Sequence, residues 1–171
     1  MKKIVKMSLV AAMVMAGLTT TASAFDMSSI EKSASFALVS GSMDAGGSTT
    51  TDMGFSAEVV GMTKIDRPGF EKIKVGGGLA FTSIDNTTII DLKSVVEYGV
   101  TPKVSIVGGL NYSMADIDGI DLDSAIGMSV GALYEIKTGL KAGVDITKAS
   151  YGSNAGDLDI TTTNLKVAYS F

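Results

Sequence analysis

Four aspartates close together are the side chains of this sequence best suited to bind a metal ion. They are Asp116, Asp118, Asp121 and Asp123, and they flank Gly119. Alternate carboxylates around a glycine turn can gather several oxygens for Ca²⁺. The spacing departs from the EF-hand loop, in which glycine follows three alternating ligands and a glutamate lies further on. A solvated acidic loop is therefore the preferred interpretation, with calcium binding as the alternative, and we expect no cofactor.

Other charged residues are spread along the chain, and histidine and cysteine are absent. Without histidine, a Ser-His-acid triad is excluded. Eleven charged side chains, six positive and five negative, fall on the polar face of predicted strands: Glu58, Lys72, Lys74, Asp91, Lys93, Glu97, Lys103, Glu135, Lys141, Asp145 and Lys166. A carboxylate pair among them could transfer protons. The near balance of signs instead favours ion pairs that fill an enclosed interior, because buried charges need partners.

Eight predicted strands position these charges. Apolar and polar side chains alternate along residues 34–42, 53–64, 71–83, 90–98, 103–112, 126–135, 140–147 and 158–171. A tilted strand of about ten residues crosses the hydrocarbon layer of a membrane. The rows expected to face outward are Phe36 and Leu38; Phe55, Ala57 and Val59; Ile73, Val75 and Leu79; Ile90, Leu92 and Val96; Val104, Ile106 and Leu110; Ile126, Met128 and Val130; Leu140, Val144 and Ile146; and Leu165, Val167 and Tyr169. Inside the third strand, Gly76-Gly77-Gly78 is expected to relieve crowding or bend the sheet.

The last residues form the clearest apolar row. Leu165, Val167, Tyr169 and Phe171 share one face of an extended strand, because successive side chains point to opposite faces. The row resembles the C-terminal signal by which bacterial outer-membrane β-barrels are recognised for assembly, in which a final Phe follows alternating apolar and aromatic residues. The resemblance implies that the barrel-assembly machinery is a partner.

The predicted connections and the positions of the aromatic residues are also those expected of an outer-membrane barrel. Tight turns are expected after the second, fourth and sixth strands, as at residues 66–69, and mostly longer polar loops after the first, third, fifth and seventh, although the loop at residues 83–87 is short. Short periplasmic turns and long extracellular loops are typical of outer-membrane barrels, as are aromatic girdles. One predicted girdle contains Tyr98, Tyr134, Tyr169 and Phe171 beside the turns, and the other contains Phe55, Phe81 and Tyr112 beside the loops.

The first 24 residues are typical of a secretory signal peptide. Lys2, Lys3 and Lys6 precede the apolar residues 7–18, and residues 22–24 form a small-residue cleavage site. Removing three lysines leaves 14 − 3 = 11 basic against 18 acidic residues, a net charge near −7. Nucleic acid is therefore not an expected partner. We expect residues 1–24 to be cleaved, residues 25–33 to be a periplasmic lead-in and residues 34–171 to form the barrel.

With the signal peptide set aside, the chain resembles the small eight-stranded outer-membrane β-barrels of the OmpA membrane domain, OmpX and opacity-protein type. The expected fold class is all-β, an eight-stranded antiparallel up-and-down transmembrane β-barrel. The resemblance implies location in the outer membrane and contact with its lipid and lipopolysaccharide. It also makes residues 43–52, 113–123 and 150–157 candidate loops for a surface ligand, with divalent ions as one means of joining the acidic loop to lipopolysaccharide.

Three functions are compatible with these patterns. Enzymes among barrels of this size, such as lipid A deacylases and palmitoyltransferases, rely on a histidine that this chain lacks, so we expect no enzyme. A structural or adhesin-like surface-interaction role is preferred. The alternatives are a narrow channel for small ions or solutes, and a soluble periplasmic barrel of lipocalin type, in which the charged face would lie outside and the apolar face inside.

Overall fold

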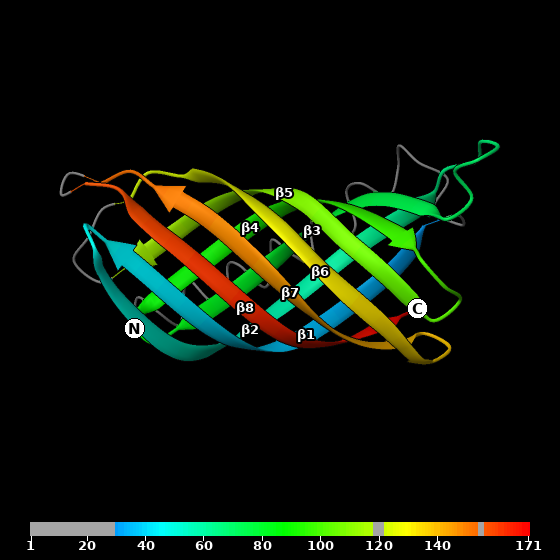
Figure 1. Cartoon of the computed structure of the whole chain (residues 1–171), viewed down its shortest axis with the longest axis horizontal. Coiled ribbons are helices and arrows are strands. Elements are labelled where there is room, and N and C mark those ends of the chain that lie inside the picture. Colours follow the sequence, from blue (N-terminus) through cyan, green and yellow to red (C-terminus); the bar gives the residue numbers. More distant parts are fainter. Residues whose placement is uncertain (1–29, 118–121, 154–155) are drawn as a thin grey trace. The chain divides into compact units, whose positions relative to one another are not determined.

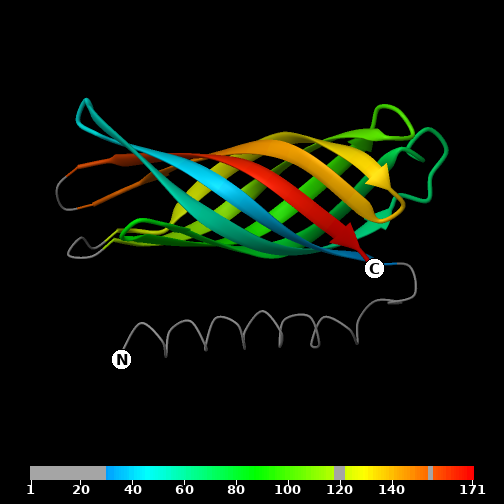
Figure 2. The ribbon, with the colours of Figure 1, turned by 90° about the horizontal axis from the view of Figure 1, so that it is seen from below.

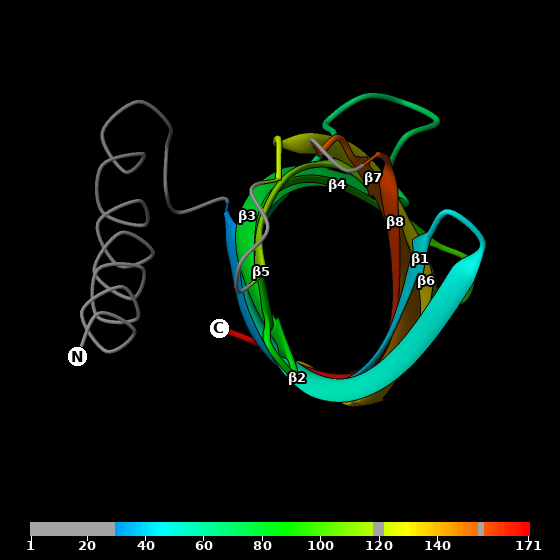
Figure 3. The same ribbon diagram turned by 90° about the vertical axis from the view of Figure 1, so that its left-hand side faces the viewer.

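The computed structural model describes residues 30–117, 122–153 and 156–171, which form a closed antiparallel barrel. Its strands are β1 (Glu31–Ala45), β2 (Ser48–Lys64), β3 (Ile73–Ile84), β4 (Thr87–Gly99), β5 (Val104–Ile117), β6 (Ala125–Lys137), β7 (Leu140–Tyr151) and β8 (Leu158–Ser170). Each strand pairs with the next in sequence (Figure 1), and the view along the barrel shows the closed ring (Figure 3). The predicted fold class, an eight-stranded up-and-down barrel, is confirmed. Within these residues no helix is long and apolar enough to cross a membrane.

The first and last strands close the barrel. β1 pairs with β8 from Ser33 opposite Ser170 to Ala45 opposite Leu158. Beyond Ser170, the Phe171 amide donates to the Lys32 carbonyl at 2.8 Å, and the Lys32 amide donates to the Phe171 carbonyl at 3.4 Å. The backbone of the last residue is therefore part of the closed sheet.

The two ends of the barrel differ in which connections they carry. One end, here called the C-terminal rim, carries the connections 65–72, 100–103 and 138–139 together with Phe171 (Figure 2). The other end, the opposite rim, carries the connections after β1, β3, β5 and β7. The last two of these include residues outside the described ranges.

The predicted difference in connection length is wrong after β1 and β2, whereas the connection after β3 is short, as expected. The connections after β1 and β3 consist only of residues 46–47 and 85–86, whereas the connection after β2 runs over residues 65–72. Gly46 and Gly47 have φ values of 60° and 90°. Positive φ at both central residues suits the tight hairpin turns that match strand twist, so two residues suffice.

Two strand boundaries correct the sequence-based prediction. Most of the predicted loop 43–52 is a hairpin, because β1 continues to Ala45 and β2 begins at Ser48. Its threonines favour extended structure. β1 begins at Glu31, so the last three residues of the predicted lead-in, 25–33, belong to the barrel. The predicted signal peptide and residues 25–29 lie outside the described residues.

The alternation of side chains is as predicted. Outward-facing Leu165, Val130 and Ile126 are 65%, 59% and 76% exposed, and residues on the other parity line the lumen. Close strand contact requires glycine at two inward positions of β3. A Cβ at Gly76 would lie 1.9 Å from the Gly61 carbonyl oxygen, and one at Gly78 would lie 2.3 Å from that of Val59. The crowding predicted around residues 76–78 is present.

Candidate functional site in the barrel lumen

Most of the predicted lumen charges lie on inward positions of the strands. Glu58 is on β2, Lys74 on β3, Asp91, Lys93 and Glu97 on β4, Glu135 on β6, Lys141 and Asp145 on β7, and Lys166 on β8. Lys72 and Lys103 differ: both lie in connections at the C-terminal rim and are exposed. The strands begin two residues and one residue later than the sequence pattern indicates, at Ile73 and Val104, so period-two alternation does not govern these two lysines.

An ion network joins opposite walls at the middle of the barrel. Lys166 lies 3.3 Å from Glu58 Oε1 and 2.5 Å from Asp145 Oδ2. Lys93 pairs with the other oxygen of Glu58, and the Asn164 amide donates to Asp145 Oδ1 at 2.7 Å. Asp145, Asn164 and Lys166 are all at least nine-tenths buried. Each charge of this network therefore has a partner of opposite sign, which buried charges require.

A second network lies at the C-terminal rim. Lys74 pairs with Glu31 at 2.5 Å and Lys141 pairs with Glu97 at 2.9 Å. Lys141 also lies 4.0 Å from Glu31, which joins the two pairs. These residues line a cavity of about 620 Å³ that opens at the rim.

The lumen narrows inward from that cavity. Successive pockets along the barrel have volumes of about 50, 20 and 10 Å³, the first around Glu58 and Glu97 and the last around Asp91 and Ser113. A cavity of about 10–15 Å³ holds one water molecule. An eight-stranded barrel has an interior only wide enough for its side chains, so these spaces suit isolated water molecules and exclude larger solutes.

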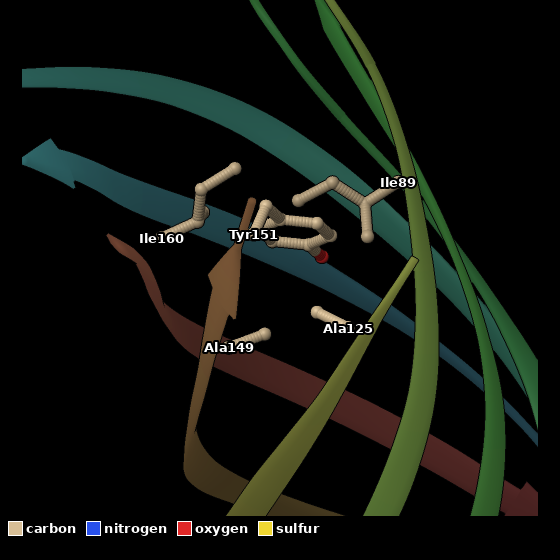
Figure 4. Packing of buried hydrophobic residues seen from close by; sticks show 5 residues of the cluster. All are labelled: Ile89, Ala125, Ala149, Tyr151 and Ile160. Carbon is tan, nitrogen blue, oxygen red and sulfur yellow. The ribbon is translucent and has the colours of Figure 1, made fainter. Parts of the chain in front are cut away.

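Toward the opposite rim, polar packing gives way to an apolar cluster. Figure 4 shows the Tyr151 ring between Ile89 and Ile160, with Ala125 and Ala149 beside it. Tyr151 is 1% exposed. Next to Tyr151, in the same small pocket, the buried Ser113 hydroxyl donates to the Asp91 carboxylate. The cluster separates the polar lumen from the opposite rim.

This cluster was missed in the sequence analysis, which assigned Tyr151 to the loop 150–157. In the structure, β7 continues to Tyr151 and turns its ring inward. The signal was the alternation of the strand: Tyr151 lies ten positions after Lys141 and six after Asp145, so it falls on the same face as these two lumen residues. Neighbouring Ser150 and Gly152 obscured it, because both are typical of loops.

The predicted calcium site is only partly described. Asp118 and Asp121 lie outside the described residues. Asp116 lies in β5 and Asp123 precedes β6, where its backbone amide donates to the Gly152 carbonyl at 2.9 Å. Within the described ranges no group of three or more acidic side chains is arranged to hold a metal ion.

The residues of the predicted assembly signal share the outer surface of β8 and its end. Leu165, Val167, Tyr169 and Phe171 are all more than half exposed. The rings of Tyr169 and Phe171 stack, with their centroids 6.4 Å apart. An apolar row thus reaches the last residue of the chain.

The distribution of apolar residues contradicts the lipocalin-type alternative. That alternative requires an apolar interior and a charged exterior, whereas the described strands carry exposed Leu, Ile and Val outside and buried ion pairs inside. The lumen also offers no large apolar cavity along its described length, since its inner pockets hold about 50 Å³ or less.

Comparisons with known proteins bear on the fold. No protein-family model matches the chain, and no curated protein sequence matches it. Among solved structures, Neisserial surface protein A covers 84% of this chain and 97% of its own, with a TM-score of 0.58 and 16% identity. Ail, the attachment invasion locus protein of Yersinia pestis, covers 83% and 99%, with a TM-score of 0.57 and 10% identity, in a complex with the heparin analogue sucrose octasulfate.

A third similar structure was determined in a lipid bilayer. The outer-membrane protein Ail of Yersinia pestis in a phospholipid bilayer nanodisc covers 82% of this chain and 99% of its own, with a TM-score of 0.51 and 12% identity. At such low identity the likeness concerns the fold. The chain therefore has the fold of the small eight-stranded outer-membrane β-barrels, as its resemblance to the OmpA and OmpX type implies.

Proposed function

We propose that this chain is an integral outer-membrane protein whose closed barrel serves a structural or surface-interaction role without catalysis or solute transport. The observation that carries the proposal is the blocked lumen. Ion pairs among Glu58, Lys166 and Asp145 cross its middle, and the Tyr151 cluster occupies the end near the opposite rim. An outer surface of exposed apolar side chains supports insertion in lipid. Closure of the barrel supports it too, because only a closed barrel or a helix satisfies every backbone hydrogen-bonding group in lipid.

Export and assembly complete the proposal. A cleaved signal peptide at residues 1–24 would deliver the chain to the periplasm, and the apolar row ending in Phe171 would be recognised by the barrel-assembly machinery. The connections of the C-terminal rim would then face the periplasm, and the opposite rim would face the cell exterior and contact lipopolysaccharide. Deletion of Phe171 should reduce the amount of barrel recovered from the outer membrane.

The opposite rim is also the proposed surface for an external ligand, and its charge indicates the kind of ligand. Its described acidic residues are Asp44, Asp52, Asp85, Asp116, Asp123, Asp157 and Asp159, against the basic Lys148. Ail is seen with sucrose octasulfate, a polyanion. An acidic rim repels such a ligand, so we expect this barrel to favour a cationic partner or contact through divalent ions.

Planar-bilayer recording tests the blocked lumen against the channel alternative. The wild-type protein, inserted and shown to be folded, should pass no current above that of the lipid alone. A double variant, Lys166→Ala with Tyr151→Ala, removes a side chain from each barrier and should increase ion passage in barrels that are first shown to be inserted and folded. Steady conductance of the wild type would replace the proposed role with that of a narrow channel.

A further inference from the structure

One stretch of β2 has a strand partner on only one side. Residues 48–53, here called the open edge, pair with β1 along their whole length. The pairing of β2 with β3 begins only at Gly54 opposite Ile84, and the β3–β4 turn at residues 85–86 ends the neighbouring wall there. No strand of the described ranges lies on that side of the open edge. The β1–β2 hairpin therefore projects at the opposite rim with one edge unpaired (Figure 2).

The free backbone groups of the open edge belong to alternate residues. Near the C-terminal rim, the Ile65 amide donates to the Ile73 carbonyl at 3.2 Å, so the backbone of Ile65 points toward β3. The direction of backbone bonding alternates along an antiparallel strand, and the register of β2 is unbroken from there to its first residue. The odd-numbered residues of the open edge therefore direct their N–H and C=O groups to the unpaired side. They are Thr49, Thr51 and Met53.

The open edge lacks the features that normally protect an exposed strand. Proteins block such edges with lysine, proline or a bulge, whereas residues 48–53 contain no lysine or proline and pair with β1 without a bulge. Three consecutive threonines favour an extended backbone. The carboxylate of Asp44 also holds the turn, because it accepts from the Gly47 amide at 3.3 Å and from the Thr49 hydroxyl at 3.1 Å. The open edge is therefore an ordered template for one more strand.

Acidic side chains border the open edge. Asp52 lies within it on the inward side, and Asp85 lies in the turn where β3 ends. Neither the hairpin from Asp44 to Met53 nor that turn contains a basic residue. Lys148, the basic residue described at this rim, is paired with an aspartate of β8. A strand added at the open edge is therefore favoured if it carries positive charge.

We propose that the open edge binds an extended, cationic segment of an external protein by antiparallel strand addition. The inference rests on the proposed function, in which this rim faces the cell exterior. The segment would exchange main-chain hydrogen bonds with Thr49, Thr51 and Met53, which supply the affinity in strand addition. Residues directly opposite in antiparallel strands share a face. Basic side chains of the segment whose own N–H groups point away from β2 would therefore lie beside Asp52.

Titration of the folded barrel in lipid nanodiscs with the peptide acetyl-Lys-Val-Lys-Thr-Lys-Val-amide tests the proposal. Amide NMR signals of Thr49, Thr51 and Met53 should shift and saturate. Two N-methylated forms separate strand addition from charge attraction, because alternate N-methyl groups block one hydrogen-bonding edge of a peptide. Methylation at the three lysines, whose N–H groups point away from β2, should leave binding within about twofold. Methylation at the other three residues should weaken it at least about tenfold.

Substitution of Thr51 tests the backbone contact on the barrel. Thr51→Pro removes an N–H group on the unpaired side, where proline is tolerated in an edge strand. It should weaken peptide binding at least about tenfold. Thr51→Val is the matched control, because it keeps the N–H group, and it should bind the peptide within about twofold of wild type. Heat-modifiable mobility on a gel establishes that both variants are folded.

A second pair of variants tests the charge. Asp52→Asn with Asp85→Asn should weaken peptide binding at least about tenfold. The control, Asp123→Asn with Asp157→Asn, changes two exposed acidic residues of the same rim that do not border the open edge, and it should stay within about twofold of wild type. Strand addition is overturned by unsaturable shifts, by equal binding of the two methylated peptides, or by equal losses in the two double variants.

The orientation of the barrel is tested separately. Nanodiscs leave both rims accessible, so the titration does not depend on which rim faces the exterior. The chain has no cysteine, and Thr50 is exposed in the hairpin. Thr50→Cys on intact cells should therefore react with a membrane-impermeant maleimide. A cysteine that reacts only after the cells are broken would overturn the external partner even where the peptide binds.

Discussion

At the scale of single residues, Lys166 is the centre of the buried ion network. It contacts both Glu58 and Asp145, whereas Glu58 has a second cation in Lys93. The position of Lys166 on the inward face follows from the alternation of β8. Its choice of partners does not, because Glu58 lies on β2, on the far side of β1, and their contact depends on the pairing of β8 with β1 that closes the barrel.

Replacing Lys166 with Met should therefore destabilise the barrel strongly. The change leaves Asp145 buried without a cation, and breaking a buried pair from one side costs about 3–5 kcal/mol. Denaturant unfolding from lipid vesicles measures the loss. The control is Lys148→Met, because Lys148 pairs with Asp159 at 2.9 Å on the exposed surface, where such pairs contribute about 0–1 kcal/mol. Equal losses in the two variants would contradict the role given to the lumen network.

A second prediction concerns the outward-facing rows of apolar side chains. Val130 lies midway along β6 and is 59% exposed. Val130→Arg should reduce the free energy of unfolding in lipid by about 2–4 kcal/mol, the cost of a charge at the bilayer midplane. Thr63→Arg, outward near the end of β2, should cost about 0–1 kcal/mol, as at the interfaces. A Val130→Arg barrel as stable as wild type would show that this face does not contact lipid.

At the scale of elements, the ends of strands were the hardest features to predict. The alternation of β3 to β8 was visible because apolar and polar residues repeat with period two. The sequence predicts a loop where the β1–β2 hairpin lies, because residues 43–52 are rich in Gly, Thr and Asp and carry no apolar row. In a projecting hairpin neither face is buried, so no such row is needed. Glycine at residues 46–47 supplies the turn and threonine the extended flanks.

The end of β7 gives a prediction of its own. Tyr151 packs between Ile89 and Ile160 and is 1% exposed. Tyr151→Ala should cost about 3–5 kcal/mol in unfolding, as for other buried aromatic residues replaced by alanine. Tyr151→Phe keeps the ring and should cost no more than about 1.5 kcal/mol. An alanine variant with unchanged stability would mean that the ring does not close the lumen.

Close contact between β4 and β5 can be tested with two adjacent glycines. A Cβ at inward Gly109 would lie 1.8 Å from the Ser94 carbonyl oxygen, whereas one at outward Gly108 would lie 3.4 Å from that of Ser129. Gly109→Ala should cost about 1–3 kcal/mol through overpacking. Gly108→Ala should be neutral or stabilise slightly, because it restricts the unfolded chain. Thermal or denaturant unfolding distinguishes them, and the reverse order would contradict the observed register.

At the scale of the whole molecule, the barrel combines an apolar exterior with a blocked polar interior. The exterior and the strand number could be predicted from sequence, since both depend on local patterns. The apolar cluster and the cavity at the C-terminal rim could not, because residues from distant strands meet there only after closure. Glu97 and Ser105, for example, line that cavity from β4 and β5 together with Ser170 of β8.

The most direct test of a closed membrane barrel is gel mobility of the mature protein from the outer-membrane fraction, before and after boiling in detergent. A barrel held by continuous strand pairing from β1 to β8 should resist detergent unheated and migrate differently once boiled. The expected result for a closed membrane barrel is recovery in that fraction and a boiling-dependent shift. Recovery as a soluble protein with one mobility under both conditions would contradict it.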